Sequence, residues 1–338
     1  MYQHILVPTD GTILSAQTIV DALQLARSLK SRVTFLHVER DHASDIYGDA
    51  ALLYSMAPEQ FAETYKLRAR ETLSKAEAAA QAADVRFDSV SRVGNSPHQT
   101  ILEIAEERGC DLIFMSSRGR NTSAGMMIGS ETLRTLIHSK IPVLVSSVAT
   151  NEGPGAYAVG VIMDEHQSIA AALHRLQEIA VEARNVGRLD DLEAVRAIVT
   201  YFREFPEKLH HPKEDTFLFD KLGRRTHDVD AELATLRKQH ADEEAYVREI
   251  QLAADEFAAK PGTGAARFSA AVERYAAFNW QHLALEESTI IPAARKHLTD
   301  ADWVEIDEAF ASNRAPLNAA SARLFRSIFT RIVNKVAH

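Results

Sequence analysis

Short apolar runs rich in β-branched residues alternate with helical periodicity through the first 145 residues. The runs have strand length, and the segments between them repeat apolar residues every three to four positions. The predicted strands are 5–7, 32–38, 85–93, 111–115 and 142–145, and the predicted helices are 16–30, 62–83, 97–108 and 130–138. This alternation predicts an α/β open, mainly parallel sheet covered by helices on both faces. Residues 39–59 fit neither period, so we expect a long connection with a short helix there.

From residue 156 onward the strand pattern disappears and only helical periodicity remains. Four amphipathic helices are predicted at 158–185, 190–222, 228–259 and 264–298. A further helical segment, with Thr299 as its expected cap, runs from Asp302 toward Lys335 and is divided near Pro316. Because short loops join long helices, the pattern predicts an all-α up-down four-helix bundle. The expected organisation is an α/β domain at 1–148, a linker at 149–156 and a bundle with an extra C-terminal helix at 157–338.

Length and composition narrow the classes of function. A chain of 338 residues is long enough for two domains. No apolar run approaches the roughly 18–20 residues that cross a bilayer, and the N-terminus does not resemble a secretory signal. The single cysteine, Cys110, permits no intrachain disulfide, which fits a cytoplasmic protein. The net charge of −9 argues against nucleic-acid binding and favours small ligands or protein partners.

The spacing of histidine and glutamate in the second half points to metal chemistry. His210 and Glu214 are four residues apart, as are His282 and Glu286, so each pair lies on one helical face. His166 and His240 place a single imidazole on each of the two other helices. Two carboxylates facing a core need neutralising partners, and mixed imidazole and carboxylate donors suit iron or manganese. We therefore predict two metal ions held by six side chains.

These residues resemble the hemerythrin-like, or HHE cation-binding, family over about residues 158–300. The matching segments are 164–166, 210–215 and 282–292. The resemblance implies a non-haem di-iron centre that can carry an oxo bridge. Its implied ligands are His166, His210, Glu214, His240, His282 and Glu286. Oxygen carriers of the family have a second histidine four residues after the third-helix histidine, and here that position is Glu244.

A count of donors shows what this difference implies. Two six-coordinate irons need twelve donor positions, and four histidines, two bridging carboxylates and an oxo bridge leave two positions open. Either Glu244 or His211 could supply a further ligand. Otherwise we expect His211 to pack beside the ligands, and Pro212 to open the helix locally.

A second group of candidate residues follows the strands of the first half. Parallel sheets bind ligands at the carboxyl ends of their strands. The residues at these ends are Pro8, Thr9, Asp10, Val38, Met115, Ser116, Gly119 and Arg120, followed by Gly129 and Ser130 at the start of a helix. Gly119 allows close approach of a phosphate, and the helix start offers free N–H groups. No lysine-containing phosphate loop of the Walker type is present.

Residues 1–148 resemble the universal stress protein family. Gly119, nine intervening residues, Gly129 and Ser130 match its nucleotide signature, whereas Ser116 stands where the pattern has glycine. The resemblance implies ATP or another adenine nucleotide bound between Asp10, Val38 and the 119–130 loop, and a homodimer formed through the last strand. The alternative is that the glycines only end a strand and permit a turn.

Two hypotheses of function follow from these observations. In the first, a stress-response regulatory or sensory protein registers oxygen, NO or redox state at a di-iron centre and reads a nucleotide in its other domain. In the second, a di-iron enzyme acts on NO or peroxide, or the protein donates iron for iron–sulfur cluster repair. The chain shows no flavin fingerprint and no second cysteine, which favours the first.

Overall fold

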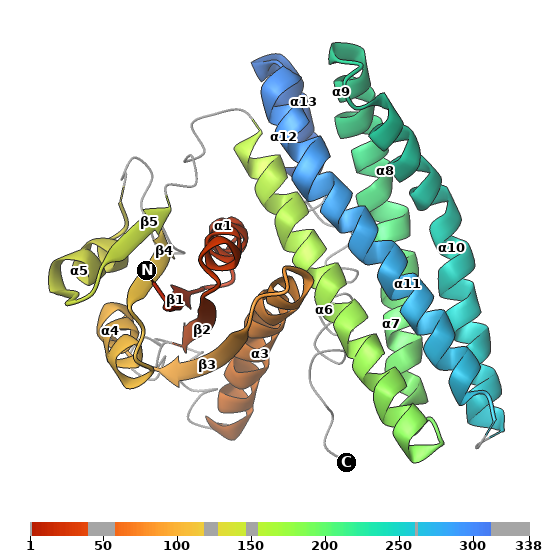
Figure 1. The fold of residues 1–338 in the computed structure, drawn as a ribbon, viewed down its shortest axis with the longest axis horizontal. Helices are drawn as coiled ribbons and strands as arrows, with labels where there is room; N and C mark the ends of the chain where they lie inside the picture. Colours follow the sequence, from red (N-terminus) through yellow and green to blue (C-terminus); the bar gives the residue numbers. More distant parts are fainter. Residues whose placement is uncertain (1, 40–57, 118–127, 147–154, 261–262, 312–338) are drawn as a thin grey trace. The chain divides into compact units, whose positions relative to one another are not determined.

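The computed structural model describes residues 2–39, 58–117, 128–146, 155–260 and 263–311 (Figure 1). The chain divides into two compact units, residues 1–150 and residues 151–338. The region predicted to form a long connection, residues 40–57, lies outside the described residues, as does the last segment, 312–338.

The first unit is built on a parallel five-stranded sheet, which confirms the predicted fold class. Its strands, in spatial order, are β3 (Phe87–Val93), β2 (Arg32–Glu39), β1 (His4–Pro8), β4 (Leu112–Ser116) and β5 (Val143–Ser146). Ile5 of the central strand pairs with Val33 on one side and Leu112 on the other. Side chains on both faces of β1 are buried, as expected of a strand covered on both sides.

Helices cover the two faces of this sheet: α1 (Ile13–Leu29), α3 (Pro58–Ala82), α4 (Pro97–Glu107) and α5 (Ser130–His138). Alternate residues of β1 enter different cores. Ile5 and Val7 pack with residues of α1 and α3, whereas Leu6 packs with residues of α4. The strand order reverses beside β1, which is the usual place for a ligand in such a sheet.

The second unit consists of four long helical rods and one shorter helix among the described residues (Figure 1). The rods are α6 (Ala156–Val186); α7 (Leu192–Glu204) continued by η2 (Pro206–His210), α8 (His211–Lys213), η3 (Glu214–Phe219) and α9 (Asp220–Arg225); α10 (Asp230–Ala259); and α11 (Ala265–Leu285) continued by η4 (Glu286–Ile290) and α12 (Ile291–His297). Consecutive rods pack against each other, and α11 also packs against α6, so the bundle closes. The predicted four-helix bundle is confirmed.

Helix α13 (Asp300–Ala311) fixes the start of the bundle. Thr299 accepts a hydrogen bond from the N–H of Asp302, as predicted for the cap. The Asp307 carboxylate accepts from the N–H groups of Gly155 and Ala158, at 2.9 and 2.8 Å. Gly155 has a φ of +89°, and a β-carbon there would lie 2.2 Å from the Trp303 ring, so only glycine fits. None of the described helices is both long and apolar enough to cross a membrane.

Candidate metal centre and strand-end site

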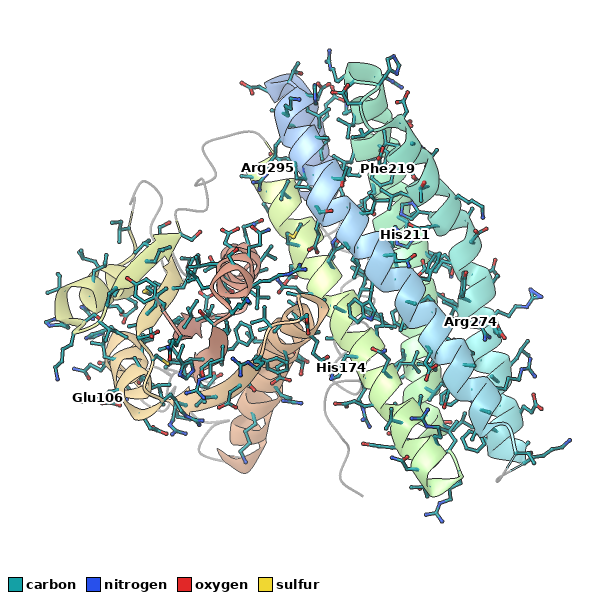
Figure 2. All side chains as sticks on the ribbon, viewed as in Figure 1. Glu106, His174, His211, Phe219, Arg274 and Arg295 are labelled. Carbon is teal, nitrogen blue, oxygen red and sulfur yellow. The ribbon has the colours of Figure 1, made fainter. Side chains whose placement is uncertain are left out.

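The six predicted metal ligands lie together in the interior of the bundle. Each of the four rods supplies one histidine, and the second and fourth rods also supply a glutamate. All six side chains are at most 6% exposed. Figure 2 labels His211 and Phe219 among the side chains of this interior.

Each glutamate presents one of its carboxylate oxygens to one group of histidines and the other oxygen to a second group. Oε1 of Glu214 lies 3.7 Å from Nε2 of His166 and 3.4 Å from Nε2 of His210, whereas its Oε2 lies 3.8 Å from Nε2 of His240. Glu286 has the same arrangement: Oε2 is 3.1 Å from His166, and Oε1 is 3.5 Å from His282. Two carboxylates placed in this way can each bridge a pair of metal ions.

The facing atoms have no hydrogen-bond partner. Seven buried atoms are unpaired here: Nε2 of His166, His210, His240 and His282, Oε2 of Glu214, and both oxygens of Glu286. Buried polar groups in proteins are normally paired, and leaving so many unpaired at one place would be costly. The donor set of imidazole nitrogens and carboxylate oxygens fits iron or manganese. The residues therefore fit the metal pair that the sequence predicts.

Without a metal ion, protons are left to balance the charges in this interior. Burial, aided by the Glu286 charge, raises the pKa of Glu214 to about 7. Burial also opposes ionisation of Glu286, but the charge of His282 and the close approach of His166, whose Nε2 lies 3.1 Å from Oε2 of Glu286, outweigh it and lower its pKa to about 2. For His166, burial is outweighed by three carboxylates, so its pKa is well above the ordinary value. A cation at the same place would take over the role of these protons.

The helices depart from regular α-helical geometry at the glutamate ligands. π-helical turns occupy residues 206–210, 214–219 and 286–290, so Glu214 and Glu286 each begin one and His210 ends one. Pro212, between two of these turns, cannot donate a backbone hydrogen bond, and the local opening predicted there is present. Such turns rotate the following side chains and are frequent at functional sites.

The outer nitrogen, Nδ1, of every one of the four histidines donates to an acceptor on the neighbouring rod. The pairs are His166 to Glu287 at 3.0 Å, His210 to Glu165 at 2.8 Å, His240 to Asp215 at 3.1 Å, and His282 to Gln239 at 3.1 Å. These hydrogen bonds leave Nε2 as the nitrogen that faces the centre. Partners of this kind fix the ring orientation of metal-binding histidines.

Sequence reasoning assigned no role to most of these acceptors, although a signal for them is present. Each is adjacent in sequence to a ligand, and adjacent helical residues point about 100° apart. On α6 and α10 the acceptor comes one residue before the predicted ligand, and on the two antiparallel rods it comes one residue after it. Because the rods alternate in direction, all four acceptors are displaced in the same sense around the bundle. A polar residue next to a predicted ligand on each rod is thus a sequence pattern from which these acceptors could have been predicted.

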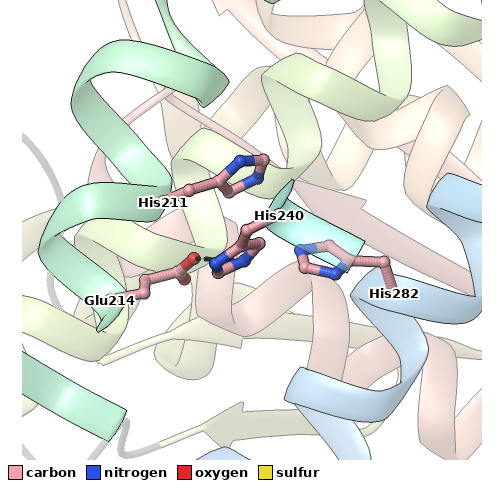
Figure 3. Close-up of side chains that lie close together, drawn as sticks. All are labelled: His211, Glu214, His240 and His282. Carbon is pink, nitrogen blue, oxygen red and sulfur yellow. Dashed lines mark ion pairs between the residues drawn. The ribbon is translucent and has the colours of Figure 1, made fainter. Parts of the chain in front are cut away.

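The two positions left open as further ligands lie in different surroundings. Glu244 is exposed on α10. His211 is buried at the centre, where its ring stacks on that of His240 with centroids 4.0 Å apart. Figure 3 shows His211, His240 and His282 gathered with Glu214.

The predicted nucleotide residues lie at the carboxyl ends of adjacent strands. Thr9 and Asp10 follow β1, and the Thr9 carbonyl is 2.9 Å from Nδ1 of His37 on β2. At the end of β4, the Ser116 carbonyl accepts from the Thr132 hydroxyl of α5, and the N–H of Gly129 donates to Ser117. Pro8, Val38 and Met115 lie at or near the carboxyl ends of β1, β2 and β4. Ser130 is the first residue of α5, and its side chain is exposed. Gly119 and Arg120 lie outside the described residues.

Comparisons with known proteins agree with this division of the chain. The model of the Universal stress protein family matches residues 1–147, and that of the Hemerythrin HHE cation binding domain matches residues 158–294. Universal stress protein MJ0577 of Methanocaldococcus jannaschii is 30% identical over 157 residues, covering 43% of this chain and 94% of its own. Universal stress protein YxiE of Bacillus subtilis is 28% identical over 149 residues, covering 43% and 99%. The solved structure of hypothetical protein MJ0577 is 25% identical, with a TM-score of 0.35, and covers 43% of this chain and 95% of its own.

Proposed function

The chain belongs to the universal stress protein family through residues 1–147 and carries a hemerythrin HHE cation-binding domain at residues 158–294, and from this premise we propose that it is a stress-response sensor. In this proposal, the bundle holds two non-haem iron ions that register oxygen, NO or redox state. The sheet domain binds ATP or another adenine nucleotide.

The seven unpaired buried atoms carry the proposal for iron. His166 and His210 would hold one ion, and His240 and His282 the other, with Glu214 and Glu286 shared between them. Iron supplies a redox-active centre that accepts small gases and oxidants. Aromatic rings pack against the histidines of this centre: Phe219 stacks on His240 with centroids 5.6 Å apart, and Phe205 on His210 at 6.3 Å. Each ring is also held from outside by its hydrogen-bonded acceptor.

The proposal for the nucleotide is supported by the strand order and by the helix start. Asp10 follows β1 and Ser116 ends β4, the two strands between which the order reverses, and Gly129 precedes the first N–H groups of α5. Helix starts of this kind attract phosphate groups, and a carboxylate such as Asp10 accepts hydrogen bonds from a ribose.

Metal content and optical absorption test the proposal directly. The full chain is purified without oxygen, its iron per chain is measured, and its absorption in the near ultraviolet is followed on exposure to air. We expect two irons per chain and a new near-ultraviolet band. At most one ion per chain under excess iron would contradict the proposal. Steady-state turnover of NO or peroxide with an added reductant would instead identify an enzyme.

A further inference from the structure

A chain of polar side chains leads away from the candidate ligands inside the bundle. The Tyr275 hydroxyl of α11 donates a hydrogen bond of 2.7 Å to Oε1 of Glu243 on α10. The other oxygen of Glu243, Oε2, lies 3.1 Å from Nδ1 of His211, and the His211 ring stacks on that of His240 with centroids 4.0 Å apart. Tyr275 is fully buried, and the side chains of Glu243 and His211 are 2% and 8% exposed. The chain thus joins a buried phenol to a candidate iron ligand without passing through solvent.

The pair of Tyr275 and Glu243 has the geometry for losing an electron and a proton together. A phenol gives up an electron readily only when its proton leaves at the same time, and the base that takes the proton must lie within hydrogen-bond reach. Burial, the charge of Glu243 and the hydrogen bond between the two raise the pKa of Tyr275 well above its ordinary value, so the phenol keeps its proton until it is oxidised. Loss of both leaves a neutral pair, which is the form that a buried site tolerates best.

Aromatic rings continue from Tyr275 toward the surface of the bundle. The centroid of the Tyr246 ring of α10 lies 6.4 Å from that of Tyr275, and the Tyr246 ring stacks on Phe278 of α11 at 4.6 Å. Both separations are within the range of aromatic contact. Tyr246 and Phe278 are partly exposed, whereas Tyr275 is not. A reductant in solution can therefore reach Tyr246 and, through it, the buried phenol.

We infer that Tyr275, Glu243 and Tyr246 form an outlet for oxidising equivalents, which leads from the metal centre to the surface when hydrogen peroxide reacts there. This inference rests on the proposed di-iron centre and deepens it, because it states where the oxidising power of such a reaction goes. Without an outlet, the nearest oxidisable side chains are the histidines around the metal. A protein that registers redox state keeps its own ligands intact in this way.

Each passage of an electron is balanced by a proton. The O–H bond of Tyr275 breaks, its proton goes to Glu243, and its electron goes toward peroxide. Two such electrons, with two protons from solvent, break the O–O bond of one hydrogen peroxide and give two waters. An electron from Tyr246 then restores Tyr275 as Glu243 returns the proton, and Tyr246 gives its own proton to solvent. Ascorbate, a reductant in solution, restores Tyr246 by giving one electron and one proton.

Electron paramagnetic resonance of rapidly frozen samples tests the outlet. The full chain is loaded with iron, its iron per chain is measured, and it is mixed with hydrogen peroxide. Protein made with ring-deuterated tyrosine identifies a tyrosyl radical by the change in its spectrum. We expect this radical in the wild type and in the control Tyr157→Phe, which alters a tyrosine of α6 outside the outlet, and none in Tyr275→Phe. The metal-free chain should give none.

Two further variants separate the proton from the electron. Glu243→Gln keeps an oxygen for the Tyr275 hydrogen bond but cannot take the proton, so radical formation should slow by about 100-fold or more, the usual consequence of losing a positioned base. Tyr246→Phe keeps the Tyr275 radical but removes its link to solvent, so the radical should disappear more slowly when ascorbate is added.

The outcomes separate this inference from the proposed function. Fewer than two irons per wild-type chain would overturn the proposed function itself. Two irons with no tyrosyl radical in the wild type, or with the same radical in Tyr275→Phe, would overturn only the inference. If Tyr275→Phe fails to fold or to bind two irons, Glu243→Gln decides in its place, and an unchanged rate of radical formation would contradict the inference. An unchanged response to ascorbate in Tyr246→Phe would overturn the outlet as proposed.

Discussion

The two candidate sites of this chain differ in whether their polar groups are already paired. In the bundle, Nε2 of four histidines and three oxygens of two glutamates face one another without partners. At the strand ends, Oδ1 of Asp10 accepts from the N–H and the hydroxyl of Thr12, at 3.0 and 2.7 Å, and the N–H of Gly129 donates to Ser117 at 2.7 Å. The first site presents donor atoms that suit a cation, whereas at the second the local chain already supplies partners.

This difference has a physical origin. The candidate ligands of the bundle are side chains on packed helices, so they stay in place and cannot turn away to find water. At the strand ends the local backbone supplies partners, and a ligand must compete with them or use the donors that remain. We therefore expect substitutions to have large effects on metal binding in the bundle and smaller ones on nucleotide binding in the sheet domain.

The largest effect is expected from Glu214→Ala. Glu214 belongs to both clusters of candidate ligand atoms that lie within 4.8 Å of one another, so its removal takes an oxygen donor from each. We expect loss of both irons, measured as iron per chain after desalting, while circular dichroism keeps its helical signal. Glu244→Ala, an exposed glutamate of α10, is the control and should keep both ions. Retention of two irons by Glu214→Ala would remove the reason to regard this carboxylate as a bridge.

The sequence predicted that the six candidate ligands come together, because the information for this is carried by their spacing. A step of four residues returns to the same helical face, and His210, Glu214, His282 and Glu286 therefore converge whatever the details of packing. The π-helical turns could not be predicted in the same way, apart from the opening at Pro212. Their hydrogen-bonding pattern depends on the surrounding rods.

The burial of both His210 and His211 was also beyond the reach of spacing. His210 and His211 are adjacent, so an ideal α-helix would point them about 100° apart and send only one inward. Both are buried here, in a segment where one π-helical turn ends and a short α-helical turn begins. At the strand ends, by contrast, the sequence motif depends on backbone shape, and its residues Gly119 and Arg120 lie outside the described part of the chain.

The next largest effect is expected from removing an acceptor that orients one of the histidine rings through a hydrogen bond to its Nδ1. Glu165 accepts from Nδ1 of His210 at 2.8 Å, and it is largely buried. Glu165→Ala should lower iron affinity by about 10- to 100-fold, the usual consequence of losing such a partner. Competition with a chelator of known affinity measures it. Glu193→Ala, at an exposed position of α7, is the control. An unchanged affinity would mean that packing alone orients His210.

A smaller effect is expected in the sheet domain. Asp10→Ala removes a carboxylate at the end of β1 and also frees the Thr12 groups that it holds. We expect ATP affinity to fall about tenfold, equivalent to ~1.4 kcal/mol, with iron content unchanged. Isothermal titration calorimetry with ATP measures the first, and metal analysis the second. Equal ATP affinities in the two proteins would exclude Asp10 from the nucleotide site. A parallel loss of iron would mean that the substitution acts beyond the nucleotide site.

The smallest expected effect is the pH dependence of the stability of the metal-free chain. This effect is specific to the buried carboxylates and histidines of the bundle. Burial raises the pKa of Glu165 to about 8 and that of Glu214 to about 7, from 4.5. Between pH 6.5 and 8 the folded chain therefore holds protons that the unfolded chain has released, so stability falls as pH rises. The pKa of His282, lowered by burial to about 4, acts only below pH 6.5, because above it this histidine is neutral in both states.

Calorimetry of the chelator-treated chain should accordingly show the unfolding temperature falling by about a few degrees from pH 6.5 to pH 8. The iron-loaded chain should change less, because the cations replace the protons. Glu165→Gln, which cannot ionise, should flatten the metal-free profile without altering the bundle's packing. If the metal-free and iron-loaded profiles ran parallel, the buried carboxylates would not be charge-balanced by metal, and the contrast between the two sites would lose its physical basis.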